Sequence, residues 1–256
     1  MIGRVRLRVA DGDRTRSYYE RTIGLRTLGT DDGVVSLGAG GTPLVQLVAD
    51  PSAPPAPPGR TGLFHLALLV PDRPSLAQAV KRVVGSGERF TGASDHFVSE
   101  ALYLRDPEGN GIEIYRDRPR SEWEYEANGE LRMGTVALDL DPIMAELPPG
   151  DDPGMPEGTV MGHVHLHVAD LRASEEFYAG RLGLDVTVRS YPGALFLSRD
   201  GYHHHVGLNT WQGPGAPPPP PGSRGLEGFE VRLPNVSPGE LADPSENRLR
   251  VRTAAG

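Results

Sequence analysis

Hydrophobic and polar residues alternate along Gly162–Asp170, whose sequence is GHVHLHVAD. Period-two alternation is typical of a half-buried β-strand, in which successive side chains point to opposite faces of the sheet. We therefore expect the three histidines of this stretch on one face and the aliphatic residues between them on the other. These histidines are His163, His165 and His167.

A second run of histidines, His203–His205, lies in the sequence GYHHHVGLNTW, which also resembles a strand. By strand parity His203 and His205 would share a face, and His204 would point the other way. A lone histidine on a polar face is usually structural, but two runs in one segment favour a metal site, because imidazole is the commonest side-chain metal ligand. The chain has no cysteine, so any metal must bind nitrogen and oxygen donors.

The same strand pattern occurs near the N-terminus, where Gly3–Asp11 reads GRVRLRVAD. At an offset of 159 residues (162 − 3), it matches Gly162–Asp170 except that arginines replace the three histidines. The same offset aligns Tyr19 with Tyr178, Gly24 with Gly183 and Leu25 with Leu184. This agreement indicates one structural unit that is used twice. The arginines are Arg4, Arg6 and Arg8.

Each copy has the order strand, helix and three strands, a βαβββ unit. The helices are expected at Arg14–Arg21 and Ala173–Arg181, each followed by a glycine that favours a helix end. The later strands are expected at Leu25–Thr30, Val34–Leu37 and Pro43–Ala49, and at Asp185–Ser190, Ala194–Ser198 and His203–Thr210.

Two further related segments follow proline-rich spacers, Pro51–Gly59 and Gly213–Gly222. DPEGNGIEIY (Asp106–Tyr115) corresponds to DPSENRLRVR (Asp243–Arg252), but the stretch before the second leaves no room for a helix and two strands. The fourth unit is therefore truncated, or a segment is absent. We divide the chain into residues 1–116 (units 1–50 and 60–116), a bridge at 117–160, and residues 161–256 (units 161–212 and 223–256).

The length of 256 residues suits two domains, and the net charge of −8 argues against nucleic acid or an anionic membrane as a partner. The N-terminus enters a strand pattern directly, without the apolar run of a signal peptide, and no membrane span is apparent. A cytoplasmic protein is therefore expected. Pairing of units within one chain or across a homodimer both remain possible.

The four units, HVHLHVAD and DPEGNGIEIY together resemble the vicinal oxygen chelate superfamily, which includes glyoxalases, bleomycin resistance proteins and extradiol dioxygenases. The second and third units are similar to the two-domain subgroup named catechol 2,3-dioxygenase. The resemblance implies an α+β fold in which paired βαβββ units form cup-shaped half-barrels. Each cup can hold a divalent metal on His and Glu, with positions open for the oxygens of a substrate.

Carried onto this chain, the resemblance implies metal ligands on the first and last strands of the units. The middle units offer His65, Glu113, His163 and His205 at these positions, whereas the outer units offer Arg4, Gln46, Gly228 and Arg250. We therefore predict that units two and three build one metal cup. Pairing of units one with two and three with four is the alternative. The donor set suits Fe(II) best, with Mn(II), Ni(II) or Zn(II) possible.

The resemblance also makes His96 a candidate catalytic acid or base, since histidine titrates near neutral pH. His165, Tyr103 and Asn209 are candidate substrate-binding residues. For His96 and His165, a surface loop contact and a solvated strand position are the plain structural alternatives.

The leading functional prediction is a metal-dependent extradiol dioxygenase that cleaves the ring of a catechol-like diol. A glyoxalase-like lyase or isomerase is the first alternative, and a metal-free protein that binds or sequesters a small molecule is the second. Metal content separates the last from the others, and consumption of dioxygen separates the first two.

Overall fold

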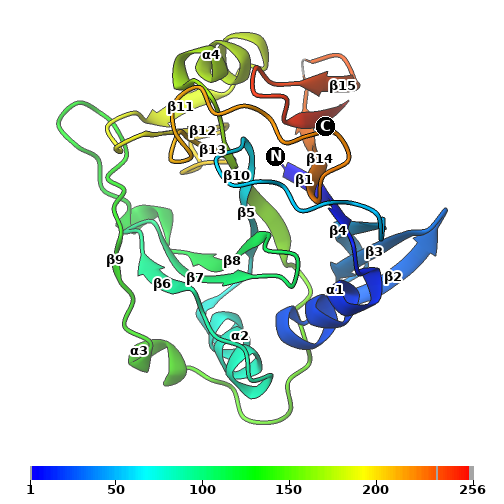
Figure 1. Ribbon diagram of the computed structural model, residues 1–256. Coiled ribbons are helices and arrows are strands. Elements are labelled where there is room, and N and C mark those ends of the chain that lie inside the picture. The colour runs from blue at the N-terminus through cyan, green and yellow to red at the C-terminus, as the bar shows by residue number, and fades with distance from the viewer. Residues whose placement is uncertain (1, 235, 254–256) are drawn as a thin grey trace.

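The computed structural model describes residues 2–234 and 236–253, and they form two β-sheets with helices beside them (Figure 1). One sheet has seven strands in the order β15-β16-β14-β1-β4-β3-β2, and the other has nine in the order β11-β12-β13-β10-β5-β8-β7-β6-β9. In Figure 1 the blue N-terminal unit lies beside the orange and red C-terminal strands. The α+β class predicted from the sequence is confirmed.

The first three units have the predicted order of elements. Unit one comprises β1 (Ile2–Val9), α1 (Gly12–Tyr18), η1 (Tyr19–Ile23), β2 (Arg26–Asp31), β3 (Val34–Ala39) and β4 (Thr42–Ala49). Unit two comprises β5 (Gly62–Leu69), α2 (Arg73–Gly85), β6 (Gly92–Asp95), β7 (Ser99–Arg105) and β8 (Gly111–Asp117). Unit three comprises β10 (Val160–His167), α4 (Leu171–Glu175), η3 (Glu176–Arg181), β11 (Asp185–Val188), β12 (Ala194–Ser198) and β13 (Val206–Asn209).

Unit four comprises only β14 (Gly225–Leu233), β15 (Gly239–Ala242) and β16 (Arg248–Thr253). The described part of this unit therefore has three strands and no helix, as expected of a unit that is truncated or lacks a segment. The bridge contains the short elements η2 (Arg120–Glu122), β9 (Val136–Ala137) and α3 (Asp141–Met144). Trp123 packs the bridge against the rest of the protein, since it is buried, whereas Tyr125 is 64% exposed.

An aspartate begins the helix of each complete unit. The Asp11, Asp72 and Asp170 side chains accept hydrogen bonds from the backbone N–H groups three residues later, at 2.8–2.9 Å. These N–H groups have no partner inside the helix, so the aspartates satisfy them and fix where each helix starts.

Two antiparallel strand pairs join units from opposite halves of the sequence. β5 pairs with β10 at the centre of the nine-stranded sheet, and β1 pairs with β14 in the seven-stranded sheet. Units two and three therefore share one sheet, and units one and four share the other. The predicted pairing of the middle units is confirmed, and the alternative pairing is wrong for the sheets.

The period-two pattern separates the two faces of each sheet. Aliphatic residues at alternate positions of β1, β5 and β10 belong to one large buried cluster, together with helix residues such as Tyr19 and Tyr178. Leu7, Leu66 and Leu166 are examples of these strand residues. The intervening polar residues face the hollow of each cup. Tyr19 donates a hydrogen bond to Asp106 at 3.3 Å, and Tyr178 donates one to Asp243 at 3.0 Å, so the repeat seen in the sequence recurs in the packing.

The predicted strand His203–Thr210 is shorter in the structure, because β13 begins only at Val206. His203–His205 lie in the connection that precedes it, and strand parity does not apply to them. Within the described ranges, no helix combines the length and the apolar character needed to cross a membrane.

Candidate metal centre

Three buried side chains meet at the centre of the nine-stranded sheet: His65 on β5, Glu113 on β8 and His163 on β10. Glu113 Oε2 lies 3.0 Å from His65 Nε2 and 3.1 Å from His163 Nε2. The two Nε2 atoms are 3.3 Å apart. The three donor atoms therefore form a nearly equilateral triangle.

The register of the three strands produces this triangle. Ala67 on β5 pairs with Glu113 on β8 and, on its other side, with His163 on β10. His65 precedes Ala67 by two residues and shares its face of the sheet. One side chain from each of three neighbouring strands is thereby brought to the same point of the cup.

The triangle fits a divalent metal. Two imidazoles and one carboxylate on one face of an ion are the ligands of non-haem iron oxygenases. Bonds of about 2.1 Å at right angles place neighbouring ligand atoms about 3.0 Å apart, close to the spacing of the three donors here. Such an arrangement leaves the opposite face of the ion open to other ligands.

The protonation states also suit a metal. Burial lowers the pKa of His163 to about 4, so its ring is neutral at neutral pH. Burial acts to raise the pKa of Glu113, but the adjacent His163 and His65 outweigh it and hold that pKa well below its ordinary value. A neutral imidazole and an ionised carboxylate are the forms that bind metal.

His205, the predicted fourth ligand, is not part of this cluster. The prediction aligned it with Gln46 at the repeat offset of 159, but Arg6 pairs with Gln46 whereas the equivalent His165 pairs with Gly207. The last-strand offset is therefore 161 (207 − 46). One extra residue lies before β12, where Phe196 corresponds to Ser36 (196 − 36 = 160), and a second lies between β12 and β13.

His205 instead packs against Tyr202, with ring centroids 4.8 Å apart, and its Nδ1 accepts a hydrogen bond from the Arg199 N–H at 3.2 Å. The fourth ligand position is occupied by Gly207, which has no donor. A Cβ atom at Gly207 would lie 2.9 Å from Cγ of His165, so the His165 ring fills the space where a fourth ligand would stand.

A cavity of about 400 Å³ opens beside the triangle. Aromatic side chains dominate its wall, namely Phe64, Tyr103, Tyr191, Phe196 and Trp211. Of the predicted catalytic and substrate-binding residues, His96, Tyr103 and His165 line this cavity. His165 Nε2 is buried and has no hydrogen-bond partner among the described residues, so it is available to a ligand.

Asn209 lies outside the cavity wall, contrary to its predicted contact with substrate. Its Oδ1 accepts hydrogen bonds from His167 Nδ1 at 2.7 Å and from the Trp211 N–H at 3.1 Å. Asn209 therefore shapes the turn after β13, which carries Trp211 to the cavity.

A hydrogen bond joins Tyr103, which lies beside the triangle, to His96. Tyr103 on β7 pairs directly with Glu113 on β8. Burial, together with the charge of Glu113, raises the pKa of Tyr103 well above its ordinary value, so its hydroxyl keeps its proton. His96 Nδ1 lies 2.6 Å from the Gly134 carbonyl, which only accepts, so Nδ1 carries the ring proton. His96 Nε2 then accepts from the Tyr103 hydroxyl, at 2.6 Å.

His204 also lines the cavity, which the sequence did not predict. Its ring centroid lies 4.1 Å from that of His163, and its Nδ1 is 2.8 Å from Nδ1 of His203. His203 Nε2 in turn contacts Asp117 at 2.9 Å. The prediction failed because alternation was applied to residues that are not in a strand.

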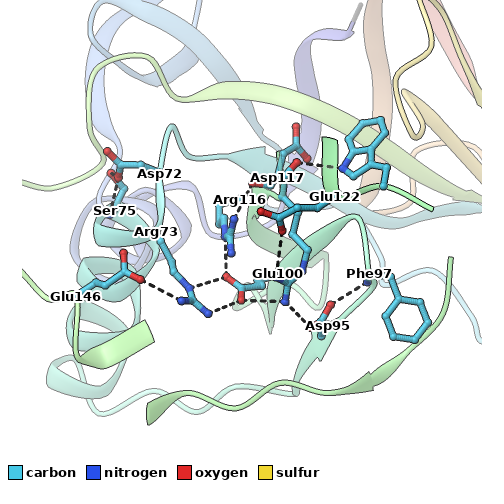
Figure 2. Close-up of polar contacts among 12 residues, drawn as sticks. Asp72, Arg73, Ser75, Asp95, Phe97, Glu100, Arg116, Asp117, Glu122 and Glu146 are labelled. Carbon is cyan, nitrogen blue, oxygen red and sulfur yellow. Dashed lines mark hydrogen bonds and ion pairs between the residues drawn. The ribbon is translucent and has the colours of Figure 1, made fainter. Parts of the chain in front are cut away.

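A buried ion cluster supports the hairpin that carries Tyr103 and Glu113 (Figure 2). Glu100 on β7 contacts Arg73 of α2 at 2.7 Å, Arg116 of β8 at 2.6 Å and Arg118 at 3.2 Å. These arginines hold the pKa of Glu100 below its ordinary value although burial acts to raise it. The cluster ties the start of α2 to the β7–β8 hairpin.

Residues 1–114 match the family model described as glyoxalase/bleomycin resistance protein/dioxygenase superfamily. A Bacillus subtilis (strain 168) protein named catechol-2,3-dioxygenase is 42% identical over 253 residues, which cover 97% of this chain and 87% of that protein.

Two solved structures are similar in fold. A Bacillus subtilis protein that is named provisionally as a dioxygenase superposes with a TM-score of 0.68 at 14% identity, covering 98% of this chain and 84% of its own. Glyoxalase I from Zea mays superposes with a TM-score of 0.60 at 17% identity, covering 98% of this chain and 91% of its own.

Proposed function

The chain belongs to the glyoxalase/bleomycin resistance protein/dioxygenase superfamily, and we propose that it is an extradiol dioxygenase that opens the ring of a catechol-like diol. The observation that carries the proposal is the buried triangle of His65, Glu113 and His163 beside a cavity with an aromatic wall. The relative named catechol-2,3-dioxygenase supports the same reaction.

In this proposal the three side chains hold one divalent metal, and Fe(II) suits both the ligand set and the reaction best. When bound, the metal supplies Lewis acidity toward the diol oxygens and a redox partner for dioxygen. The protein contributes one negative charge and two neutral rings, so an ion with two positive charges keeps a net positive charge that attracts an ionised diol.

The cavity wall selects and orients the substrate. Flat aromatic side chains such as Phe64, Phe196 and Trp211 suit an aromatic ring, which packs against them in offset or edge-to-face geometry. The volume of about 400 Å³ lies at the small end of the range for ligand pockets, which favours a compact substrate. His165 presents its unpartnered Nε2 to polar groups of that substrate.

The Tyr103–His96 pair is proposed to take the proton that the diol loses on binding. Tyr103 and His96 both line the cavity, and the Tyr103 hydroxyl donates a hydrogen bond to His96 Nε2 at 2.6 Å. A proton that reaches Tyr103 can therefore pass along the existing hydrogen bond to His96. General base catalysis of this kind contributes about 10²–10⁴-fold to a rate.

The test is an anaerobic sample loaded with Fe(II) and then mixed with catechol and dioxygen. We expect uptake of dioxygen and a yellow ring-fission product, and loss of both in Glu113→Gln with the fold intact by circular dichroism. Metal binding without dioxygen uptake across a panel of catechols would instead favour the lyase or isomerase. Failure to bind any divalent metal would favour the metal-free binding protein.

A further inference from the structure

A second and larger cavity, of about 860 Å³, occupies the cup of the seven-stranded sheet. Five arginines line this cavity. Three come from β1, where they stand at the positions that histidines occupy on β10, and two come from β16. They are Arg4, Arg6, Arg8, Arg248 and Arg250. Four glutamates also line the cavity, so its lining carries one more arginine than glutamate, in a chain whose net charge is −8. They are Glu227, Glu230, Glu240 and Glu246.

Two neighbouring rows of side chains on the cup face differ in how their charges are balanced. One row carries Arg4, Glu230, Arg250 and Glu240 on adjacent strands. Glu230 lies 3.7 Å from Arg4 and 3.5 Å from Arg252, and Glu240 binds Arg250. Positive and negative charges alternate along this row, and each cation has a carboxylate nearby.

The other row has a gap at its centre. Arg6 on β1 pairs with Gly228 on β14, and the register of β14 with β16 places Arg248 on the far side of that glycine. Neighbouring strands lie about 4.8 Å apart, so the Cα atoms of Arg6 and Arg248 are separated by about 10 Å. Gly228 has no side chain to fill the space between the two guanidinium groups.

The two arginines of this row have spare donors. Arg6 uses its Nε to bind Glu227 at 2.6 Å. The Arg248 side chain makes no hydrogen bond or ion pair with any residue that the structure describes, although its charge acts on Glu240. An arginine carries five N–H donors in a planar fork that matches the oxygens of a carboxylate or phosphate.

We propose that this outer cup is a second small-molecule site, which binds an organic anion through a carboxylate or phosphate group held between Arg6 and Arg248 above Gly228. The row of paired charges beside it fixes the walls, and Pro218–Pro221 from the spacer close one side.

Isothermal titration calorimetry of the full chain at constant ionic strength tests the proposal, with citrate and inorganic phosphate as probes. We expect saturable binding of at least one probe, weakened about tenfold or more in Arg248→Gln, which removes one charge-assisted contact. Arg252→Gln is the matched control, since Arg252 lies on the same strand, pairs with Glu230 and does not line the cavity. Binding in this control should change by less than about twofold.

Gly228→Val provides an independent test, because its side chain would fill the gap without changing any charge. We expect it to abolish probe binding while dioxygen uptake with catechol stays unchanged. Absence of saturable heat for both probes up to about 10 mM would overturn the proposal. Equal affinity in Arg248→Gln and wild type would overturn it as well, as would sedimentation evidence that Arg248 mediates self-association instead.

Discussion

His163 Nε2 lies 3.3 Å from His65 Nε2 although 98 residues separate them in the sequence. The contact exists because β5 and β10 are antiparallel neighbours at the centre of one sheet. Each half of the chain therefore contributes a histidine to the candidate metal centre, and neither half contains the centre alone.

We predict that the chain binds about one divalent metal, and that Glu113→Gln or His163→Ala weakens binding by about 100-fold or more, since each removes one of three ligands. His205→Gln should bind metal as wild type does, because His205 packs on Tyr202 outside the triangle. Elemental analysis and calorimetry measure the affinities. Loss of metal in His205→Gln with retention in His163→Ala would contradict the assignment.

Removal of the metal should lower thermal stability. The three buried donor atoms lie within 3.3 Å of one another, and a bound ion gives them a common partner. A ligand whose free concentration is 100 times its Kd stabilises the folded protein by about 2.7 kcal/mol. For a chain of this size we expect a fall in Tm of roughly 5–10 °C on chelation. Scanning calorimetry with and without chelator checks this, and Glu113→Gln, treated identically, should show no such fall.

Tyr103→Phe and His96→Gln should each lower kcat with catechol by about 100-fold, with little change in KM, because both interrupt the same proton path. The double variant should be no slower than the slower single variant, as expected for groups that act as a unit. Tyr125→Phe is the control, since Tyr125 is 64% exposed and should keep full activity. Steady-state dioxygen uptake gives kcat for the two single variants, the double variant and the control. If the losses of the two single variants multiplied in the double variant, the two residues would not share a path.

Most of the fold could be predicted from the sequence because its signals are local or repeated. Alternation predicted which residues of β10 face the cup. The glycines Gly24 and Gly183 marked the helix ends, whereas the helices begin two residues before the predicted Arg14 and Ala173. The segregation of His and Glu into units two and three predicted which units pair. This pairing follows from the chemistry of the residues, since arginines at the outer positions cannot share a metal site.

The errors arose where chain length varies inside a repeat. A constant offset of 159 placed His205 in the metal centre. One extra residue before β12 and another between β12 and β13 shift the register by two residues and put Gly207 there. Loop lengths leave no mark in the hydrophobic pattern of the strands that they join. The contribution of His204 to the cavity depends on the same irregular connection, and so could not be read from alternation.

The ion cluster around Glu100 provides a test of what holds the site in place (Figure 2). Glu100 is 1% exposed and is the common partner of Arg73, Arg116 and Arg118. Glu100→Gln would leave three guanidinium groups without their shared carboxylate, and we expect it to lower the free energy of unfolding by about 3 kcal/mol at pH 7. Glu146→Gln is the matched control, because Glu146 binds the same Arg73 at 3.0 Å but has a side chain that is 43% exposed. The control should cost about 0.5 kcal/mol or less.

The cost of Glu100→Gln should also depend on pH. The arginines hold the pKa of Glu100 below its ordinary value in the folded protein, so the ionised carboxylate stabilises the fold above the unfolded pKa of about 4.3. That stabilisation is lost as the pH falls through the lower folded pKa, where Glu100 takes up a proton and becomes similar to glutamine. Urea unfolding of wild type and of Glu100→Gln measures the difference between their free energies of unfolding. This difference should stay constant from about pH 5.5 to 7 and shrink below about pH 4. A difference that does not shrink in acid would mean that the substitution acts through packing, and that the charge of Glu100 does not stabilise the β7–β8 hairpin.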